Sequence, residues 1–519
     1  MLRIKQLPLV AALAALTACQ ATPSTTKPAA APSIAAIDTI VVIYAENRSF
    51  DNLYGHFPGA NGLQNLKPEQ YLQRDRDGSV LKELPPVPNA LTTPSDPKEI
   101  PTEATRGHPN RPYALDDPNG YGVTLDYQLH DLVHAFYNEQ MQINGGRNDM
   151  FAAISDAGGE TMGYFDGSKM AMWKIAQKYT LADDFFHAAF GSSFLNHQYL
   201  ICACAPFDFK TQADPENYRS NVSEANDAGT ALRMDPRSPK SALDGPPKFA
   251  HYANLTPDYY AVNTMQPPYQ PSGNKSAKDG DPRFADADKR NTLSPQVAET
   301  IGDRLSAANV SWAWYAGAWQ VALDEGRELA KVAFQYHHQP FNYYVNYAPG
   351  KPARAEHLRD GGMDGAKFIA DIDAGKLPQV VFYKPQGNLN QHAGYATIAA
   401  GDAHIADVIA HLEKSPQWPH MLVVVTYDEN GGWWDHVAPP KGDRWGPGLR
   451  IPAIIVSPFA KRGYVDHTQY DTGSIQRLIN RRFGLKPLPG IELRDSSLKA
   501  NGMAPMGDLT AALDLPQGK

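Results

Sequence analysis

The sequence has little cysteine and no excess of positive charge, and each shortage excludes a class of protein. Only three of the 519 residues are cysteines, which excludes a scaffold held together by many disulfides. Lys and Arg number 48 against 56 Asp and Glu, so the net charge is −8 with histidine neutral. Duplex binding depends on clustered Lys and Arg, and the chain has no basic stripe, so no nucleic-acid partner is expected.

A long hydrophobic run is also missing, even at the N-terminus. After Arg3 and Lys5, the apolar run from Leu9 to Leu16 is too short to span a membrane as a helix. This pattern predicts a signal peptide over residues 1–18. Leu16-Thr17-Ala18-Cys19 looks like a bacterial lipobox, which would be cut before Cys19 and lipidated there. An ordinary secretory peptide with a chance cysteine is the alternative.

Both alternatives predict export. Gln20 stands where a retained lipoprotein carries aspartate, so we expect an outer membrane-anchored lipoprotein that faces the periplasm or the cell surface. The membrane would then be a partner through the N-terminal lipid anchor. Residues 19–37, rich in Ala, Pro, Thr and Ser, predict a flexible tether.

The two remaining cysteines, Cys202 and Cys204, are separated by a single alanine. A disulfide across one residue would be strained. We therefore interpret them as small, buried apolar residues, with a redox or metal-binding role as the alternative.

Short apolar runs alternate with helical patterns along the mature chain. Because 42% of the residues are hydrophobic, a full core can form. Strands buried on both faces are predicted at Ile40–Tyr44, Val380–Tyr383, Leu422–Thr426 and Ile451–Val456. Helices are predicted at Leu129–Asn144, Met162–Tyr179, Gln296–Ala307, Gly365–Ile372 and Ala403–Leu412. This alternation predicts an α/β sandwich with a mostly parallel central sheet.

Two long stretches interrupt this pattern. Residues 57–122 and 206–294 are rich in Pro, Asp, Gly and Asn, and loops this long are unusual in a compact domain. We interpret them as insertions that form a loop-rich cap over one end of the sheet, or else as surface loops. The catalytic domain is predicted at 38–490 and a C-terminal tail at 491–519.

Polar residues follow two of the predicted strands, where ligands bind in open α/β sheets. Glu46 and Asn47 come after the first strand, and Asp428 and Glu429 come after the Leu422–Thr426 strand. Three carboxylates and an amide placed together would need a cation, and oxygen ligands suit a hard divalent metal ion. Taken singly, each pair could instead be a solvated loop or a Gly-rich turn.

A serine turn and a set of histidines supply further candidates. In Gly191-Ser192-Ser193, a serine near a helix N-terminus would face the positive end of the helix dipole, or would simply cap the helix. His134, His337, His338 and His392 lie in polar settings. Gathered at strand ends, they could hold a phosphoryl group and donate protons, whereas a single histidine is usually structural.

These motifs together resemble the bacterial phosphoesterase family that contains secreted phospholipases C and the respiratory-burst-inhibiting acid phosphatase. The resemblance covers roughly residues 38–483, and its most specific match lies at 426–432, continuing through Asp435-His436-Val437 and Pro439-Pro440. Residues 46–51 match the opening motif, and Asp131-x-x-His134, with Asn144-Gly145-Gly146 beyond it, matches the next. Gly191-Ser192-Ser193 with Asn196 stands where the phospholipases carry Gly-Pro-Thr with Asn-Arg. The resemblance implies an alkaline-phosphatase-like fold.

The resemblance also implies roles for individual residues. One divalent metal ion, of unknown identity, would be held by Glu46, Asn47, Ser193, Asp428 and Glu429. Ser193 would be the nucleophile, and His134, His338 and His392 would surround the phosphate of a phosphorylated small-molecule substrate. Supporting positions around the site would be Asp131, His337, Asn196, His197, Asp435 and His436.

Two departures from the phospholipase pattern favour the acid phosphatase branch: Ser193 replaces threonine and His197 replaces arginine. The expected function is therefore an exported, metal-dependent acid phosphatase that works through a phosphoserine. The alternatives are a phospholipase C or other phosphodiesterase, and a non-catalytic lipoprotein on the same fold. We expect phosphomonoesters to be cleaved faster than phosphatidylcholine, because 206–294 has few aliphatic runs that could form a lipid channel.

Overall fold

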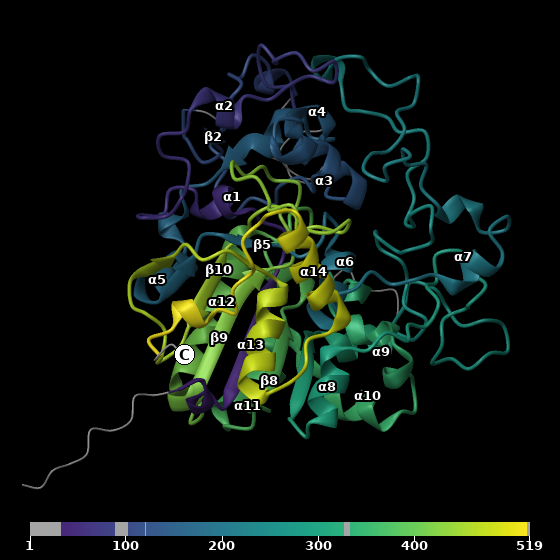
Figure 1. The fold of residues 1–519 in the computed structure, drawn as a ribbon, viewed down its shortest axis with the longest axis vertical. Coiled ribbons are helices and arrows are strands. Elements are labelled where there is room, and N and C mark those ends of the chain that lie inside the picture. The colour runs from purple at the N-terminus through teal and green to yellow at the C-terminus, as the bar shows by residue number, and fades with distance from the viewer. Residues whose placement is uncertain (1–32, 89–101, 120, 326–332, 516–519) are drawn as a thin grey trace, which may run out of the picture.

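The computed structural model describes residues 33–88, 102–119, 121–325 and 333–515 (Figure 1). The predicted signal peptide, most of the predicted tether and Cys19 lie outside the described residues. The first described element is the 3-10 helix η1 (Ile34–Ala36), followed by the fully buried Ile37.

An eight-stranded sheet forms the centre of the fold, in the order β11-β4-β10-β9-β1-β8-β6-β7. All neighbouring pairs are parallel except those of β10, which runs antiparallel to β9 and β4. The predicted α/β architecture with a mostly parallel sheet is therefore confirmed. The strands are β1 (Thr39–Ala45), β4 (Thr180–Ala182), β6 (Trp312–Gly317), β7 (Leu358–Gly362), β8 (Val380–Lys384), β9 (Met421–Tyr427), β10 (Ala453–Val456) and β11 (Tyr464–Asp466).

The apolar sequences of the central strands explain their position. Every residue of β1, β8 and β9 is buried, as expected of strands covered on both faces. In register, Val42 of β1 lies between Phe382 of β8 and Val424 of β9. The carboxyl ends of these three neighbouring strands therefore meet at one edge of the sheet.

Two groups of helices pack beside this sheet. In one group, α5 (Ala171–Lys178) and α11 (Ala366–Asp373) contact α12 (Ile398–Lys414); in the other, α6 (Ser193–Cys202) contacts α8 (Ile301–Ala307) and α13 (Gly473–Phe483). Residues 489–500 of the C-terminal segment form α14 (Pro489–Ala500), which lies in front of the sheet with α13 in Figure 1. The remaining short helices are α1 (Phe50–Tyr54), α2 (Pro68–Tyr71), α3 (Phe136–Ile143), α4 (Phe151–Ile154), α7 (Phe209–Ala213), α9 (Trp319–Glu325) and α10 (Pro352–His357).

Three predicted helices are shorter in the structure than the sequence indicated, and the one expected from Gln296 begins only at Ile301 as α8. The helix expected from Leu129 begins only at Phe136 as α3, because Ala135 is extended, and it ends where Asn144 turns left-handed with φ 49°. The helix expected from Met162 begins only at Ala171 as α5. The residues between form the short strand β3 (Gly163–Tyr164), which pairs with β2 (Tyr113–Ala114).

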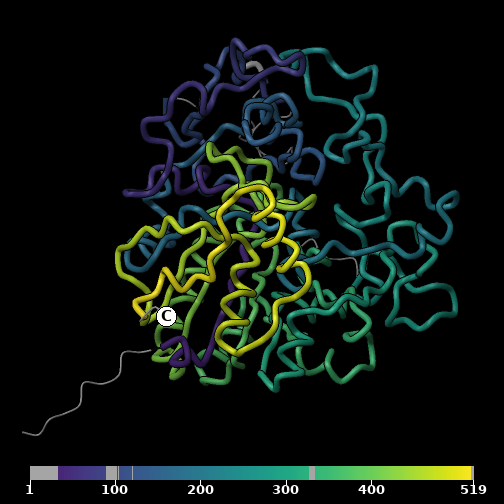
Figure 2. The backbone as a smooth tube through the Cα atoms, viewed as in Figure 1, coloured from purple at the N-terminus to yellow at the C-terminus, as the bar shows by residue number. Residues whose placement is uncertain are grey.

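The described residues of the two insertions contain little regular structure and lie together. Figures 1 and 2 show the described part of 57–122 over one end of the sheet and 206–294 along one side of the molecule. Arg76 joins them, since its guanidinium donates to the carbonyls of Pro239, Ser241 and Gly245. Asp75 accepts from the Ser241 hydroxyl and from the Ala242 amide. The insertions therefore support each other as one assembly.

The interpretation of Cys202 and Cys204 as unpaired residues is wrong. They form a disulfide, with Cα atoms 5.1 Å apart. Helix α6 ends here, and Ala203 adopts a left-handed conformation with φ 50°. This turn brings the two sulfur atoms together across a single residue.

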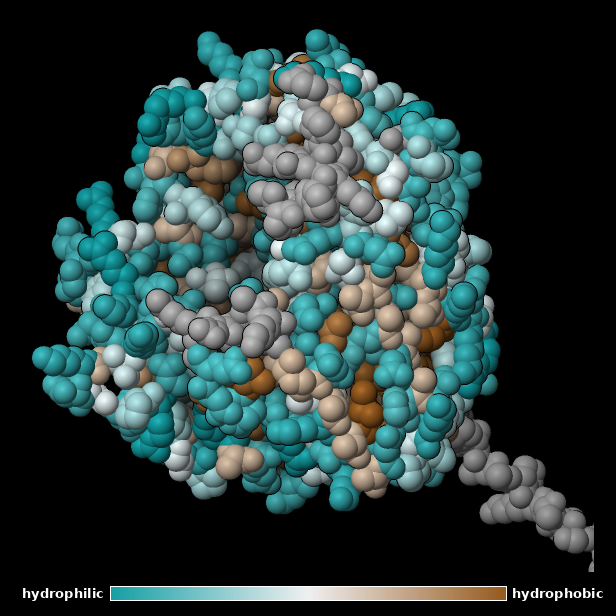
Figure 3. Space-filling model, turned by 180° about the vertical axis from the view of Figure 1, so that it is seen from behind, coloured by the Kyte–Doolittle hydropathy of each residue, from teal (hydrophilic) through white to brown (hydrophobic). Residues whose placement is uncertain are grey.

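Hydrophilic residues cover most of the face seen in Figure 3, and hydrophobic residues form narrow strips between them. The large exposed hydrophobic residues come from separate elements and include Val80, Tyr252, Val297 and Leu493. Among the residues that the structure describes, no helix is long and apolar enough to cross a membrane.

Candidate active site

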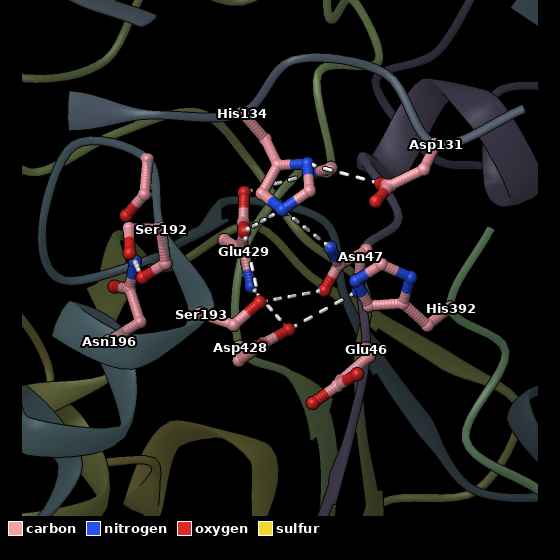
Figure 4. A network of polar contacts seen from close by, with 12 residues as sticks. Glu46, Asn47, Asp131, His134, Ser192, Ser193, Asn196, His392, Asp428 and Glu429 are labelled. Carbon is pink, nitrogen blue, oxygen red and sulfur yellow. Dashed lines mark hydrogen bonds and ion pairs between the residues drawn. The ribbon is translucent and has the colours of Figure 1, made fainter. Parts of the chain in front are cut away.

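The candidate site lies at the carboxyl ends of β1, β8 and β9 (Figure 4). Glu46 and Asn47 follow β1 directly, and Asp428 and Glu429 follow β9. All four are buried, with exposed fractions of 0 or 1%. Asn47 leaves the strand in a left-handed turn with φ 63°, and its backbone N–H donates to Asp428 at 3.2 Å. The two polar pairs predicted from sequence therefore contact each other.

Ser193 is the first residue of α6, and its hydroxyl points toward both pairs. Its Oγ lies 3.1 Å from Asn47 Oδ1 and 3.1 Å from Glu429 Oε1. A serine hydroxyl has one proton, so it donates to one of these oxygens at a time. Ser192 before it has φ 54°, which is uncommon for a residue other than glycine. Such backbone is found often at functional sites.

Glu46 is the most heavily engaged carboxylate of the site. Its Oε1 lies 2.5 Å from His338 Nε2 and 2.8 Å from Lys384 Nζ. Its Oε2 accepts hydrogen bonds from Asn390 at 2.8 Å and from Tyr395 at 2.5 Å. Burial alone would raise the pKa of Glu46, but His338 and Lys384 outweigh burial and hold the pKa well below its usual range. Glu46 therefore carries a negative charge.

Neither Asp428 nor Glu429 forms an ion pair with a lysine or arginine among the described residues, and Glu429 Oε1 lies 3.5 Å from His134 Nε2. Burial, opposed by Lys384 and assisted by Glu46, raises the pKa of Asp428 to about 6. Burial, together with Asp428, raises the pKa of Glu429 to about 8. For His134, burial lowers the pKa, but Glu429 and Asp131 outweigh it and raise the pKa to about 9. The ionised forms of Asp428 and Glu429 are thus disfavoured in this buried site, and a bound cation would stabilise them.

The residues present fit a divalent cation. Ligand atoms of Glu46, His197 and Asp428 lie within 4.8 Å of one another, as do those of Glu46, His337 and His338. Asp428 Oδ2 is buried and has no hydrogen-bond partner, although a buried carboxylate oxygen normally has one. His197 Nδ1 lies 3.6 Å from that oxygen. This nitrogen donates to the carbonyl oxygen of Ser193 at 2.7 Å, so the carboxylate oxygens remain as donors, and they suit a hard divalent cation.

The three histidines predicted to surround a phosphate do not all face the same space. His134 and His392 line a cavity of about 480 Å³ that also contains Ser192 and Ser193. Their ring centroids are 5.6 Å apart. His338 is instead turned toward Glu46 and is 1% exposed. His337, predicted only to support the site, lines the cavity.

The second insertion forms part of the cavity wall. Tyr252, Asn254, Asn263 and Thr264 all line it, next to Asp131 and Asp156. Tyr252 is 48% exposed, whereas Tyr269, at the other end of the tyrosine-rich stretch, is buried and packs within the insertion. The described residues of 57–122 are not among those that line the cavity.

The other predicted supporting residues divide into two groups. Asn196 holds the serine turn, since its side chain donates to the carbonyls of Ala189 and Gly191. Asp435 and His436 belong to a separate buried cluster with Asp51 and Arg450. The Arg450 guanidinium lies 2.9 Å from Asp435 and 3.1 Å from Asp51, and His436 lies 2.6 Å from Asp51. This cluster joins α1, which contains Asp51, to the loop after β9.

Sequence reasoning missed three polar residues that contact the site: Lys384, Tyr395 and Glu139. Lys384 could have been found, because it directly follows the predicted strand Val380–Tyr383, at the same edge of the sheet as Glu46. Tyr395 lies three residues after His392 and contacts Glu46. No sequence signal marks Glu139, a buried residue of α3 whose contacts depend on the tertiary fold.

Comparison with known proteins gives consistent matches over most of the chain. A model of the Phosphoesterase family matches residues 37–486. The non-hemolytic phospholipase C of Burkholderia pseudomallei is 24% identical over 92% of this chain, which spans 59% of that protein's length. Phospholipase C B of Mycobacterium tuberculosis is 23% identical over 92% of this chain and 78% of its own. An alkaline phosphatase superfamily protein from Vibrio parahaemolyticus covers 68% of this chain and 65% of its own, with 8% identity and a TM-score of 0.31.

Proposed function

The chain belongs to the Phosphoesterase family, and on this premise we propose that it hydrolyses phosphoric esters as a phospholipase C-type phosphodiesterase. The support for the substrate class is that relatives matching 92% of this chain are named phospholipases C. The expectation of an acid phosphatase receives no such support from the comparisons, so the alternative now becomes the main proposal.

The observation that carries hydrolysis is the placement of Ser193 Oγ. It lies at the wall of a cavity of about 480 Å³, within 3.1 Å of Asn47 and of Glu429. A cavity of this size accepts a phosphorylated head group. A non-catalytic lipoprotein on this fold would not need the carboxylates, the amide and the histidines that converge at this cavity.

In the proposed reaction, Ser193 Oγ forms a bond to phosphorus as the bond to the leaving oxygen breaks. Attack is in line, so negative charge develops on the equatorial phosphate oxygens. A bound divalent cation would be held by Glu46, Asn47, Ser193, Asp428 and Glu429, and would supply positive charge that favours the ionised serine hydroxyl. Water then hydrolyses the phosphoserine.

The histidines that line the cavity would bind the phosphoryl group, and one of them would protonate the leaving oxygen. With its pKa raised to about 9 by Glu429 and Asp131, His134 carries a proton at neutral pH and can donate it to a phosphate oxygen. His392 lies on the same cavity and stacks on Tyr395, with ring centroids 4.2 Å apart. The Glu46 contact of Tyr395 ties this histidine to the carboxylate site.

A second candidate, a phosphomonoesterase, is favoured by the polar wall of the cavity. Asp131, Asp156, Asn254, His337 and His392 line it, with few aliphatic side chains. Such a wall suits a small soluble phosphate ester as well as a lipid head group.

A substrate panel on one preparation separates the two candidates. The purified mature protein is assayed on phosphatidylcholine, a chromogenic phosphodiester and a chromogenic phosphomonoester, and its metal content is measured on the same sample. We expect kcat/KM for phosphatidylcholine to exceed that for the monoester. The reverse order would establish the phosphomonoesterase instead. No hydrolysis of any ester in a metal-loaded sample would refute both.

We also propose that the chain is exported and anchored by a lipid on Cys19. The support is the sequence Leu16-Thr17-Ala18-Cys19 after a basic and apolar start. Expression in a Gram-negative host with a labelled fatty acid should give a labelled protein in the outer membrane fraction. Cys19→Ser should lose the label, whereas Cys202→Ser should keep it. Label on the Cys19→Ser variant would refute the anchor.

A further inference from the structure

The turn that carries the candidate nucleophile has an unfavourable backbone. Gly191 has φ +49°, and a Cβ at this position would lie 2.5 Å from the carbonyl carbon of Ala135. Ser192, which has a Cβ, has φ 54°. Left-handed conformations are held only where the surroundings fix them. Something near the turn must therefore compensate for its strain.

A buried ion pair lies directly behind this turn. Glu139 of α3 and His187 are both fully buried, and Glu139 Oε1 is 2.9 Å from His187 Nε2. Glu139 Oε2 accepts the backbone N–H of Gly191, and Oε1 also accepts that of Leu449 at 3.2 Å. His187 Nδ1 lies 2.8 Å from the carbonyl oxygen of Ala189. Each partner of the ion pair thus bonds one residue of the turn.

The charges of the pair follow from these contacts. Both nitrogens of His187 face acceptors, so both carry protons and the ring is an imidazolium. In agreement, the Glu139 carboxylate outweighs burial and raises the pKa of His187. Hydrogen bonds to charged groups are stronger than neutral ones. The Gly191 amide is therefore held by an ionised acceptor in a site closed to water.

We propose that Glu139 and His187 are positioning residues that hold the turn of residues 189–193 so that Ser193 Oγ faces the phosphate. The same short segment also fixes His134, whose backbone carbonyl accepts the Ser192 N–H at 2.5 Å. Residues 134–139 therefore set the nucleophile and the cavity-lining imidazole relative to each other. A small displacement of a reacting group can lower a rate about 100-fold.

The first test replaces Glu139 by glutamine, which keeps the shape and removes the charge. Glu139 accepts from three groups, His187 Nε2–H and the backbone N–H groups of Gly191 and Leu449. In the glutamine variant, one of these donors would face an amide NH2 group. We expect faster backbone hydrogen exchange in the peptide that contains residues 189–193, measured by mass spectrometry. On a chromogenic phosphodiester we expect kcat to fall at least about tenfold and KM to stay within about twofold, since only the positioning of the nucleophile changes.

The matched control replaces a buried carboxylate elsewhere in the fold. Asp466 at the end of β11 is 1% exposed and accepts bonds from Thr468 N, Thr468 Oγ1 and Tyr470 OH at 2.7 to 3.0 Å. Asp466→Asn should lower stability without changing exchange at 189–193 or kcat. Equal exchange at the turn in wild type and folded Glu139→Gln would overturn the proposal.

A second pair of variants covers the case in which Glu139→Gln does not fold. His187→Gln keeps an N–H donor near the position of Nε2, whereas His187→Ala removes it. We expect kcat to be largely restored in His187→Gln relative to His187→Ala, and equal kcat values would count against the proposal. The kcat measurements rest on the proposed hydrolysis, but the hydrogen-exchange measurements do not. If the wild type is inactive but hydrogen exchange at 189–193 is faster in the variants, the proposed function is refuted and the positioning role of Glu139 and His187 is supported.

Discussion

Replacing Lys384 with methionine removes the only ammonium group that contacts Glu46 among the described residues. Both side chains are 0% exposed, and Nζ lies 2.8 Å from Glu46 Oε1. Methionine has a similar length and fills the same volume with apolar atoms. The substitution therefore isolates the charge of Lys384 from its packing.

The structure sets the size of the expected effect. Removing one partner of a buried ion pair usually costs about 3–5 kcal/mol, because the other charge stays buried. Glu46 keeps its contacts with His338, Asn390 and Tyr395, so a loss near the lower limit, about 3 kcal/mol, is expected. Glu46→Gln alone should cost a similar amount, since Lys384 would then be the buried charge without a partner.

Combining the two substitutions removes both charges. The double variant should cost about 2 kcal/mol less than the sum of the single variants. The free energy of unfolding is measured by urea titration, followed by the fluorescence of the eight tryptophans, with a chelator present so that no metal contributes. A loss below about 1 kcal/mol for Lys384→Met, or simple additivity in the double variant, would refute the reasoning.

The remaining predictions concern the nucleophile, the metal and one acid far from either. Ser193→Ala should fold normally and lose nearly all turnover of a chromogenic phosphodiester; wild-type turnover would make Ser192 the next candidate. Asp428→Asn and Asn47→Ala should each lower bound metal, measured by elemental analysis, together with activity, and unchanged metal in both would contradict the ligand assignment. Burial raises the pKa of Asp184 to about 6, so the folded state binds more protons than the unfolded state between pH 4 and 6, and stability falls as pH rises through that range. Asp184→Asn should therefore stabilise the protein by about 1–3 kcal/mol at pH 7.5 and change little at pH 4, as read by urea titration.

The sequence predicts the centre of the fold well because the central strands are uninterrupted apolar segments. β1, β8 and β9 are short apolar runs, and the polar residues that end them mark the edge where ligands gather. Among the strands it missed, β7 lacks that signature, because it contains Arg359 and Asp360. β6 reads Trp-Ala-Trp-Tyr-Ala-Gly, an apolar run that carries the signature and was overlooked. Their strand conformation depends on pairing with β8 and with each other.

The part of the candidate site that could be predicted consists of residues that are adjacent in sequence and follow a strand together. Glu46-Asn47 and Asp428-Glu429 each leave a strand together, so their convergence follows from the parallel sheet. Glu139 is different, because the groups that it binds lie 48, 52 and 310 positions away in the chain. Periodicity places it on a helix but does not show what that helix faces. The same limit applies to His338, whose contact with Glu46 depends on the path of the chain between β6 and β7.

The polarity of the cavity does not decide between a phosphate monoester and a phospholipid. The small number of aliphatic runs in 206–294 counts against a lipid only if the acyl chains must enter the site. A phospholipid carries its phosphate in the head group, so the head group alone has to reach Ser193 while the chains stay outside. The cavity of about 480 Å³, with Tyr252 half-exposed at its wall, is compatible with that arrangement. What separates the two substrates is the second ester group, which a phosphodiesterase must accommodate next to the phosphate. If residues 252–264 form that second position, Tyr252→Ala should lower kcat/KM for a chromogenic phosphodiester more than for the matching monoester, and an equal loss on both would exclude them.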